Sequence, residues 1–255
     1  MDFCFVLFSL IRIFAPMKRR MIRILMTAML CLMLPAVVNA QIEEMRPTKR
    51  SAAGVVKRKA IKSKRQLTVE DMYDKGEEYD TQKDYQQAFA WFKRAADKGH
   101  APSQTWIGYY YEMGLGTEKD LTASTEWYRK AAKNNDAYGQ YKLGTSYFHG
   151  RGVEQDYEQA LSWLTAAAKK GNAGAQDYLG YCYKSGIGVA MDYDKSFYWY
   201  KKAANKGCAH AQLNLGNCYY NGEGTEKDVE KAREWWQKAA DQGLDAAREY
   251  LERFY

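Results

Sequence analysis

The stretch "AGAQDYLGYCYKSGIGVAMDYDKSFYWYKKAANKG", residues 173–207, is one copy of a pattern that returns every 36 residues. Between residues 100 and 243 the pattern continues without an insertion or a deletion. Single tryptophans, paired alanines and paired glycines keep this step, at Trp91, Trp127, Trp163, Trp199 and Trp235, at 95–96, 131–132, 167–168, 203–204 and 239–240, and at 114/116, 150/152, 186/188 and 222/224. A period of this length predicts a solenoid of stacked supersecondary units.

Each unit contains two helical patterns separated by a glycine turn. In residues 136–171, the first pattern starts at Ala137 with the spacing of one helix face, and the glycines of 150–152 end it. Asp156 is a suitable N-cap for a second helix, and Gly171 is a suitable C-terminal stop. Each unit is therefore predicted to be an αα-hairpin.

The residues shared by these units follow the form A-x-A-Q-x-x-L-G-x-x-Y-x-x-G-x-G-V-x-x-D-x-x-x-A-x-x-W-Y-x-x-A-A-x-x-G, which is almost complete in residues 173–207. This form resembles the Sel-1-like repeat family of the tetratricopeptide superfamily, in particular its exported bacterial members. The resemblance implies an all-α fold, a right-handed α/α superhelical solenoid of about five helix-turn-helix repeats. We expect the solenoid to span residues 67–255, with units at 68–99, 100–135, 136–171, 172–207 and 208–243 and a capping helix at 244–255.

The N-terminal residues 1–40 have the build of a secretory signal region. Basic residues follow Met17, an apolar run extends from residue 24 to 34, and "VNA" ends at Ala40, after which we expect cleavage. The apolar run is short for a membrane span. We therefore expect translation to start at Met17 and the protein to be exported to the periplasm or the extracellular space. The alternative is an uncleaved anchor formed by both apolar runs.

Residues 41–66 are predicted to be a basic, disordered linker, with nine Lys or Arg against Glu43 and Glu44 and with no aromatic residue. The linker is a solvated spacer or touches an anionic membrane surface or envelope polyanion. Residues 67–255 carry 24 basic and 28 acidic side chains, so the folded part is mildly acidic. This sign argues against a nucleic-acid-binding solenoid.

The turn "HGRG", residues 149–152, has the residue types of an anion-binding loop. The equivalent turns of the other units keep both glycines, whereas the His and Arg positions become Met, Ser or Asn and Leu, Ile or Glu. What repeats is turn geometry, so we interpret His149 and Arg151 as variable turn residues. A phosphate contact by Arg151 is the alternative.

No catalytic, metal or cofactor site is predicted. The three histidines lie in separate units without ligand spacing, and the familiar serine-nucleophile and zinc motifs are missing. Cys182 and Cys218 occupy equivalent positions on neighbouring helices, whose axes lie about 8–10 Å apart, beyond the usual reach of a disulfide. We expect no disulfide between these two cysteines. Because a third cysteine, Cys208, is present, the pairing of the three remains open at this stage. Where some secreted relatives carry a cysteine, Ala168 and Ala204 stand here.

In this superfamily the first helix of each unit, helix A, lines the concave face, so the resemblance implies that its non-core positions bind partners. An aromatic and amide surface suits an extended peptide or another protein. The alternative is that some of these side chains pack between neighbouring A helices. The candidate residues are Trp106, Tyr109, Tyr141, Thr145, Tyr178, Tyr181, Asn214 and Asn217.

We therefore expect an exported, monomeric, non-catalytic repeat protein that acts as an adaptor or regulator by binding a protein or peptide. Two alternatives belong to other functional classes of protein. One is a secreted β-lactamase-like or penicillin-binding enzyme of the cysteine-rich repeat type. The other is a cell-envelope attachment protein that uses the basic linker.

Overall fold

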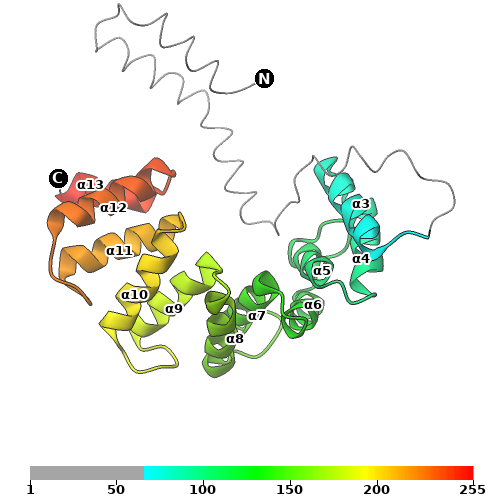
Figure 1. The fold of residues 1–255 in the computed structure, drawn as a ribbon, viewed down its shortest axis with the longest axis horizontal. Coiled ribbons are helices and arrows are strands. Elements are labelled where there is room, and N and C mark those ends of the chain that lie inside the picture. The colour runs from blue at the N-terminus through cyan, green and yellow to red at the C-terminus, as the bar shows by residue number, and fades with distance from the viewer. Residues whose placement is uncertain (1–65, 255) are drawn as a thin grey trace, which may run out of the picture. The chain divides into compact units, whose positions relative to one another are not determined.

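The computed structural model describes residues 66–254, and this part of the chain is all-α (Figure 1). The predicted all-α superhelical repeat fold is confirmed. The signal region and the linker predicted above lie outside the described residues, apart from Gln66. No helix of residues 66–254 is both long enough and apolar enough to cross a membrane. The helices are α3 (Val69–Thr81), α4 (Tyr85–Ala96), α5 (Ala101–Met113), α6 (Leu121–Lys133), α7 (Ala137–His149), α8 (Tyr157–Lys169), α9 (Ala173–Ser185), α10 (Tyr193–Ala204), α11 (Ala209–Asn221), α12 (Val229–Asp241) and α13 (Asp245–Phe254).

Local sequence signals set the limits of these helices. Helix α8 begins after Asp156, whose carboxylate accepts a hydrogen bond from the backbone N–H of Gln159 at 2.9 Å. Asp120, Asp192 and Asp228 cap the other B helices, the second helices of the complete units, in the same way. Helix α7 ends at Gly150, which adopts the left-handed conformation. The two helices predicted for residues 136–171 are therefore confirmed.

Close packing of helix A on helix B uses a repeated glycine on helix A. A Cβ atom added to Gly108 would lie 2.6 Å from the ring of Tyr128, and one added to Gly180 would lie 2.5 Å from the ring of Tyr200. Both rings are almost completely buried. The glycine therefore lets a large side chain of helix B fill the space that another residue would occupy.

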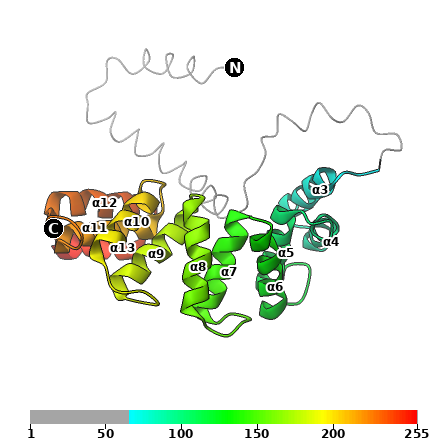
Figure 2. The same cartoon turned by 60° about the horizontal axis from the view of Figure 1, so that its bottom comes forward.

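The hairpins stack in sequence order, each B helix packing on the next A helix, so that the core consists of successive small clusters. Figures 1 and 2 show the pairs as a curved row. Contacts of α7 with both α5 and α9 place A helices next to one another. Polar side chains also link neighbouring turns, because Asn134, Lys170 and Lys206 each donate to the backbone carbonyl of the residue 35 positions earlier.

Candidate functional site

Trp106 and Thr145 are buried, with exposed fractions of 3% and 8%, so the prediction that they line an open surface is wrong. The indole of Trp106 stacks on Phe92 with ring centroids 5.2 Å apart, and its Nε1–H donates to the hydroxyl of Tyr73 at 3.3 Å. The hydroxyl of Thr145 donates to the backbone carbonyl of Lys142 at 2.9 Å. Both side chains therefore pack inside the solenoid.

The two candidate asparagines are half-buried and hydrogen-bonded within the solenoid. The side-chain amide of Asn214 donates to Asp177 Oδ1 at 3.2 Å, which links α11 to α9. The side-chain oxygen of Asn217 accepts from Trp236 Nε1 at 3.0 Å. Their amides thus hold helices in place, and the predicted role in partner binding stays a prediction for both.

Three of the four candidate tyrosines converge with two residues that the sequence reasoning had not selected. We call Tyr141, Phe148, His149, Tyr178 and Tyr181 the tyrosine cluster. Tyr178 lies at its centre, with ring centroids 6.1 Å from Tyr141 and 5.4 Å from Phe148. The Nε2 atom of His149 lies 2.9 Å from the hydroxyl oxygen of Tyr178. Tyr181 is 45% exposed, and its ring centroid lies 6.2 Å from that of Phe148.

The cluster crosses from α7 to α9 and continues to the start of α8. Tyr157, 37% exposed, places its ring 5.3 Å from Phe148. Tyr109, the fourth candidate tyrosine, lies elsewhere, against Trp106 at a centroid distance of 5.9 Å. The structure thus brings together the aromatic candidates of two neighbouring units and leaves Tyr109 apart from them.

The cluster is electrically neutral near neutral pH. Burial raises the pKa of Tyr141 and of Tyr178 above that of a free tyrosine. Burial, with a smaller contribution from the Arg151 charge, lowers the pKa of His149. The cluster therefore offers apolar ring faces with hydroxyl and imidazole groups at their edges. Such a surface can pack against apolar side chains and exchange hydrogen bonds with a backbone.

Asp177 is a partly buried carboxyl, next to Tyr178 in the chain, that sequence reasoning missed. Burial raises its pKa to about 6, and the hydrogen bond from Asn214 offsets only part of this effect. Cys208 lies in the same region, where burial, followed by the charge of Asp177, raises the pKa of its thiol to about 11. No periodic signal marked Asp177, because the equivalent positions hold Thr105, Tyr141 and Leu213.

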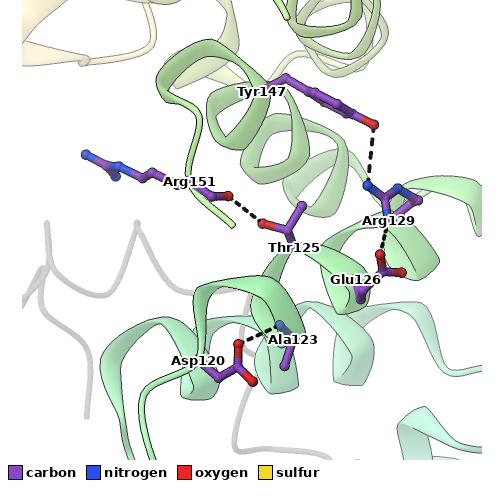
Figure 3. Close-up of polar contacts among 7 residues, drawn as sticks. All are labelled: Asp120, Ala123, Thr125, Glu126, Arg129, Tyr147 and Arg151. Atoms are coloured by element: carbon purple, nitrogen blue, oxygen red, sulfur yellow. Dashed lines mark hydrogen bonds and ion pairs between the residues drawn. The ribbon is translucent and has the colours of Figure 1, made fainter. Parts of the chain in front are cut away.

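The turn at residues 149–152 is confirmed as a structural turn. Gly152 has φ +66°, and a Cβ atom there would lie 1.9 Å from the carbonyl oxygen of Leu121. The hydroxyl of Thr125 donates to the carbonyl of Arg151 at 2.8 Å, which ties the turn to α6 (Figure 3). The Arg151 guanidinium points away from the other side chains drawn there, whereas Arg129 bonds Glu126 and Tyr147.

Within residues 66–254, no group of three or more His, Cys, Asp or Glu side chains is placed to hold a metal ion. Cys182, Cys208 and Cys218 are free thiols. Burial raises the pKa of Cys182 to about 11 and that of Cys218 to about 12, so neither thiol is activated as a nucleophile.

The fold defines an α-solenoid built from tandem helix-turn-helix repeats. The model of the Sel1 repeat family matches residues 71–100, 101–136, 137–172, 173–208 and 209–244, and the chain belongs to this family. No curated protein sequence matches it.

Solved structures of bacterial proteins share this architecture. The Sel1 repeat protein from Oxalobacter formigenes is 32% identical, with 72% of this chain and 75% of that chain covered and a TM-score of 0.69. A protective antigen present in uropathogenic Escherichia coli strains is 36% identical, with a TM-score of 0.65. That match covers 70% of this chain and 39% of the antigen. Sel1 repeat proteins generally mediate protein–protein interaction and are typically non-catalytic adaptors.

Proposed function

We propose that this chain is an exported, non-catalytic adaptor or regulator that binds a protein or peptide through the inner face of its A helices. Residues 1–40 direct export and are removed, and the basic linker 41–66 joins the solenoid to the new N-terminus. Family membership supports the interaction role. The observation that carries the proposal is the tyrosine cluster, which gathers aromatic side chains of α7 and α9 from two neighbouring units.

The physical properties of the cluster suit a binding contact. Tyr181 is 45% exposed although it lies in the middle of a well-packed repeat. Tyrosines are frequent anchors in protein interfaces because they bury a large rigid surface and still offer a hydroxyl. Here Phe148 and His149 hold Tyr178 from the side of α7, so binding would order few new side-chain torsions.

The neutral character of the cluster indicates the kind of segment that it would bind. A partner would place apolar or aromatic side chains against Tyr178 and Tyr181 and use its backbone to bond the hydroxyl and imidazole groups. Asp177, next to Tyr178 in the chain, adds a carboxyl group that would favour a basic residue nearby.

The test compares two matched double variants of the full chain. Replacing Tyr178 and Tyr181 with Ala should weaken partner capture at least about tenfold, because hot-spot residues contribute about 2 kcal/mol or more each. Replacing Tyr193 and Tyr198, which are 40% and 50% exposed on the B helix α10, should leave capture unchanged. Crosslinking pull-down from the native cells measures capture, and circular dichroism checks that both variants keep their helices.

Equal capture by both variants would contradict the proposed face. Two further measurements test the rest of the proposal. N-terminal sequencing of the protein from its native cells should begin at Gln41 if residues 1–40 are removed. Incubation with a chromogenic β-lactam should give no turnover above background, and turnover would favour the enzymatic alternative.

A further inference from the structure

The two edges of the solenoid carry opposite charge. One edge, which we call the basic edge, holds the ends of the B helices and the turns that follow them. Its segments contain twelve Lys or Arg against four Asp or Glu, and they are residues 93–101, 129–137, 165–173, 201–209 and 237–245. The other, which we call the acidic edge, holds the turns from helix A to helix B. In the four complete repeats its segments contain twelve Asp or Glu against six Lys or Arg, and they are residues 112–124, 148–160, 184–196 and 220–232.

Helix dipoles explain why each B helix has this distribution. Carboxylates stabilise a helix N-terminus and cations stabilise a C-terminus. Because the hairpins stack in sequence order, the equivalent ends of the B helices follow one another along the solenoid, and the charges of single helices add up along each edge. A local preference thus produces two long charged rows.

Many of these charges are open to solvent and lack a partner of opposite sign. Lys98, Lys133 and Lys169 are exposed on the basic edge, and none of them forms an ion pair within residues 66–254. The same is true of Glu118, Glu154 and Glu226 on the acidic edge. The intramolecular ion pairs of the solenoid therefore leave both rows available.

The two rows also share one spacing, because the same 36-residue repeat generates both. Glu118 and Glu154 lie one repeat apart, and so do Lys133 and Lys169. A second solenoid shifted along the helices of one unit would set the basic turn of that unit opposite the acidic turn of its counterpart. Charge complementarity and matched spacing thus both fit another copy of this chain.

We infer that the basic edge of one copy docks against the acidic edge of a second copy. Such a contact joins two different surfaces, so every added copy leaves a free edge, and association continues as an open series. Exposed ion pairs are individually weak, and salt screens them over about 10 Å at 0.1 M ionic strength and about 30 Å at 0.01 M. The association should therefore be concentration-dependent and confined to low ionic strength.

Sedimentation velocity of the full chain at low and high salt tests this contact. At low salt the mean sedimentation coefficient should rise steadily with protein concentration, and at an ionic strength of about 0.5 M the rise should vanish. The basic-edge variant, with Lys98→Glu, Lys133→Glu and Lys169→Glu, should sediment as a monomer. The acidic-edge variant, with Glu118→Lys, Glu154→Lys and Glu226→Lys, should do the same. An equimolar mixture of the two should associate again.

A matched control separates edge pairing from total charge. The control variant, with Lys119→Glu, Lys195→Glu and Lys227→Glu, changes the net charge as the basic-edge variant does, but on the acidic edge. It should associate at least as strongly as the unmodified chain. The inference is overturned if the unmodified chain shows no salt-sensitive association, or if the mixture stays monomeric. It is also overturned if only the acidic-edge variant loses association, because the basic linker 41–66 would then be the occupant of the acidic edge.

Discussion

The second repeat (101–136) and the fourth repeat (173–208) each form two helices in equivalent positions. The two repeats nevertheless bury different polar groups. In the second repeat, the hydroxyl of Tyr128 donates to Glu112 Oε2 at 2.6 Å, and Glu112 pairs with Lys142 at 2.6 Å. In the fourth repeat, Tyr200 occupies the equivalent position and is as deeply buried, but its hydroxyl has no hydrogen-bond partner in the described part of the chain.

A second pair of equivalent positions shows the same contrast. Thr105 is buried in the second repeat, and its hydroxyl donates to Asp136 at 2.8 Å. Asp177 takes that position in the fourth repeat, where it is a carboxyl with a raised pKa. The shared pattern thus determines the backbone and the large buried side chains, whereas single residues decide how well each unit satisfies its polar groups.

The largest expected effect concerns the second glycine of each turn. In the second repeat, Gly116→Ala places a Cβ atom 2.2 Å from the backbone oxygen of Tyr85 at φ +63°. The left-handed conformation costs about 1–2 kcal/mol for a residue with a Cβ, and the displaced backbone should bring the total loss in free energy of unfolding to about 3 kcal/mol or more. Guanidinium denaturation measures the loss.

Two alanine variants serve as controls for this prediction. Gly188→Ala in the fourth repeat places a Cβ atom 2.8 Å from Leu161 Cδ1 and 2.9 Å from Tyr157 Cβ, but 3.3 Å from the nearest backbone oxygen, so the loss should be smaller. Gly114→Ala has no neighbour closer than 3.4 Å at φ +72°, so conformational strain alone should cost about 1 kcal/mol. Equal losses for Gly114 and Gly116 would show that close approach to the preceding unit is unimportant.

The second prediction reverses the sign of one substitution between the two repeats. Tyr128→Phe removes the hydrogen bond that the Tyr128 hydroxyl donates to the half-buried carboxylate of Glu112. The free energy of unfolding should fall by about 1–2 kcal/mol. Tyr200→Phe removes a buried hydroxyl without a partner in residues 66–254 and should raise it by about 1 kcal/mol. Urea denaturation of both variants measures the difference. Destabilisation by Tyr200→Phe would mean that its hydroxyl is satisfied in solution.

Much of the framework could be predicted from the sequence because its signals are local and repeated. Asp156 caps α8 through a backbone N–H three residues later, and Gly150 ends α7 through its own backbone conformation. Neither contact depends on another unit. The spacing of Gly180 and Tyr200 also stays within one hairpin, so the packing of helix A on helix B follows from the same pattern.

The surroundings of the candidate binding residues could be predicted only in part, because contacts there join different units. Trp106 occupies a position predicted to lie on the binding surface, yet it packs against Phe92 and Tyr73 of the first unit. The first unit has a shorter turn than the complete repeats, and no periodic argument gives its fit to the second. Phe148 was missed because the equivalent positions hold Glu112, Lys184 and Tyr220, and His149 was interpreted only as a turn residue. The fold brings both side chains to Tyr178.

The last prediction tests the partly buried carboxyl of the fourth repeat, Asp177. Burial raises the pKa of Asp177 to about 6, from an ordinary value of 3.8. Between about pH 4 and pH 6 the folded protein therefore holds a proton that the unfolded chain releases, and the free energy of unfolding falls as pH rises. Above pH 6 the folded protein bears the full cost of the buried charge. Asp177→Asn should therefore stabilise the protein by about 1–2 kcal/mol at pH 7.5 and by little near pH 3.5.

Thermal unfolding at both pH values measures this difference, with the exposed Asp194→Asn as the matched control. The control makes the same chemical change at an exposed position in the first turn of α10, where a carboxylate is favourable, so it should not stabilise the protein at pH 7.5. The amide oxygen introduced by Asp177→Asn can still accept the hydrogen bond from Asn214, so the contact between α9 and α11 should survive. If Asp177→Asn destabilises the protein at pH 7.5, the ionised carboxyl of Asp177 stabilises the contact between α9 and α11. Its role would then match that of the Thr105 hydroxyl, which bonds Asp136 at the start of α7. The two repeats would then differ in the group used and would agree in how well it is satisfied.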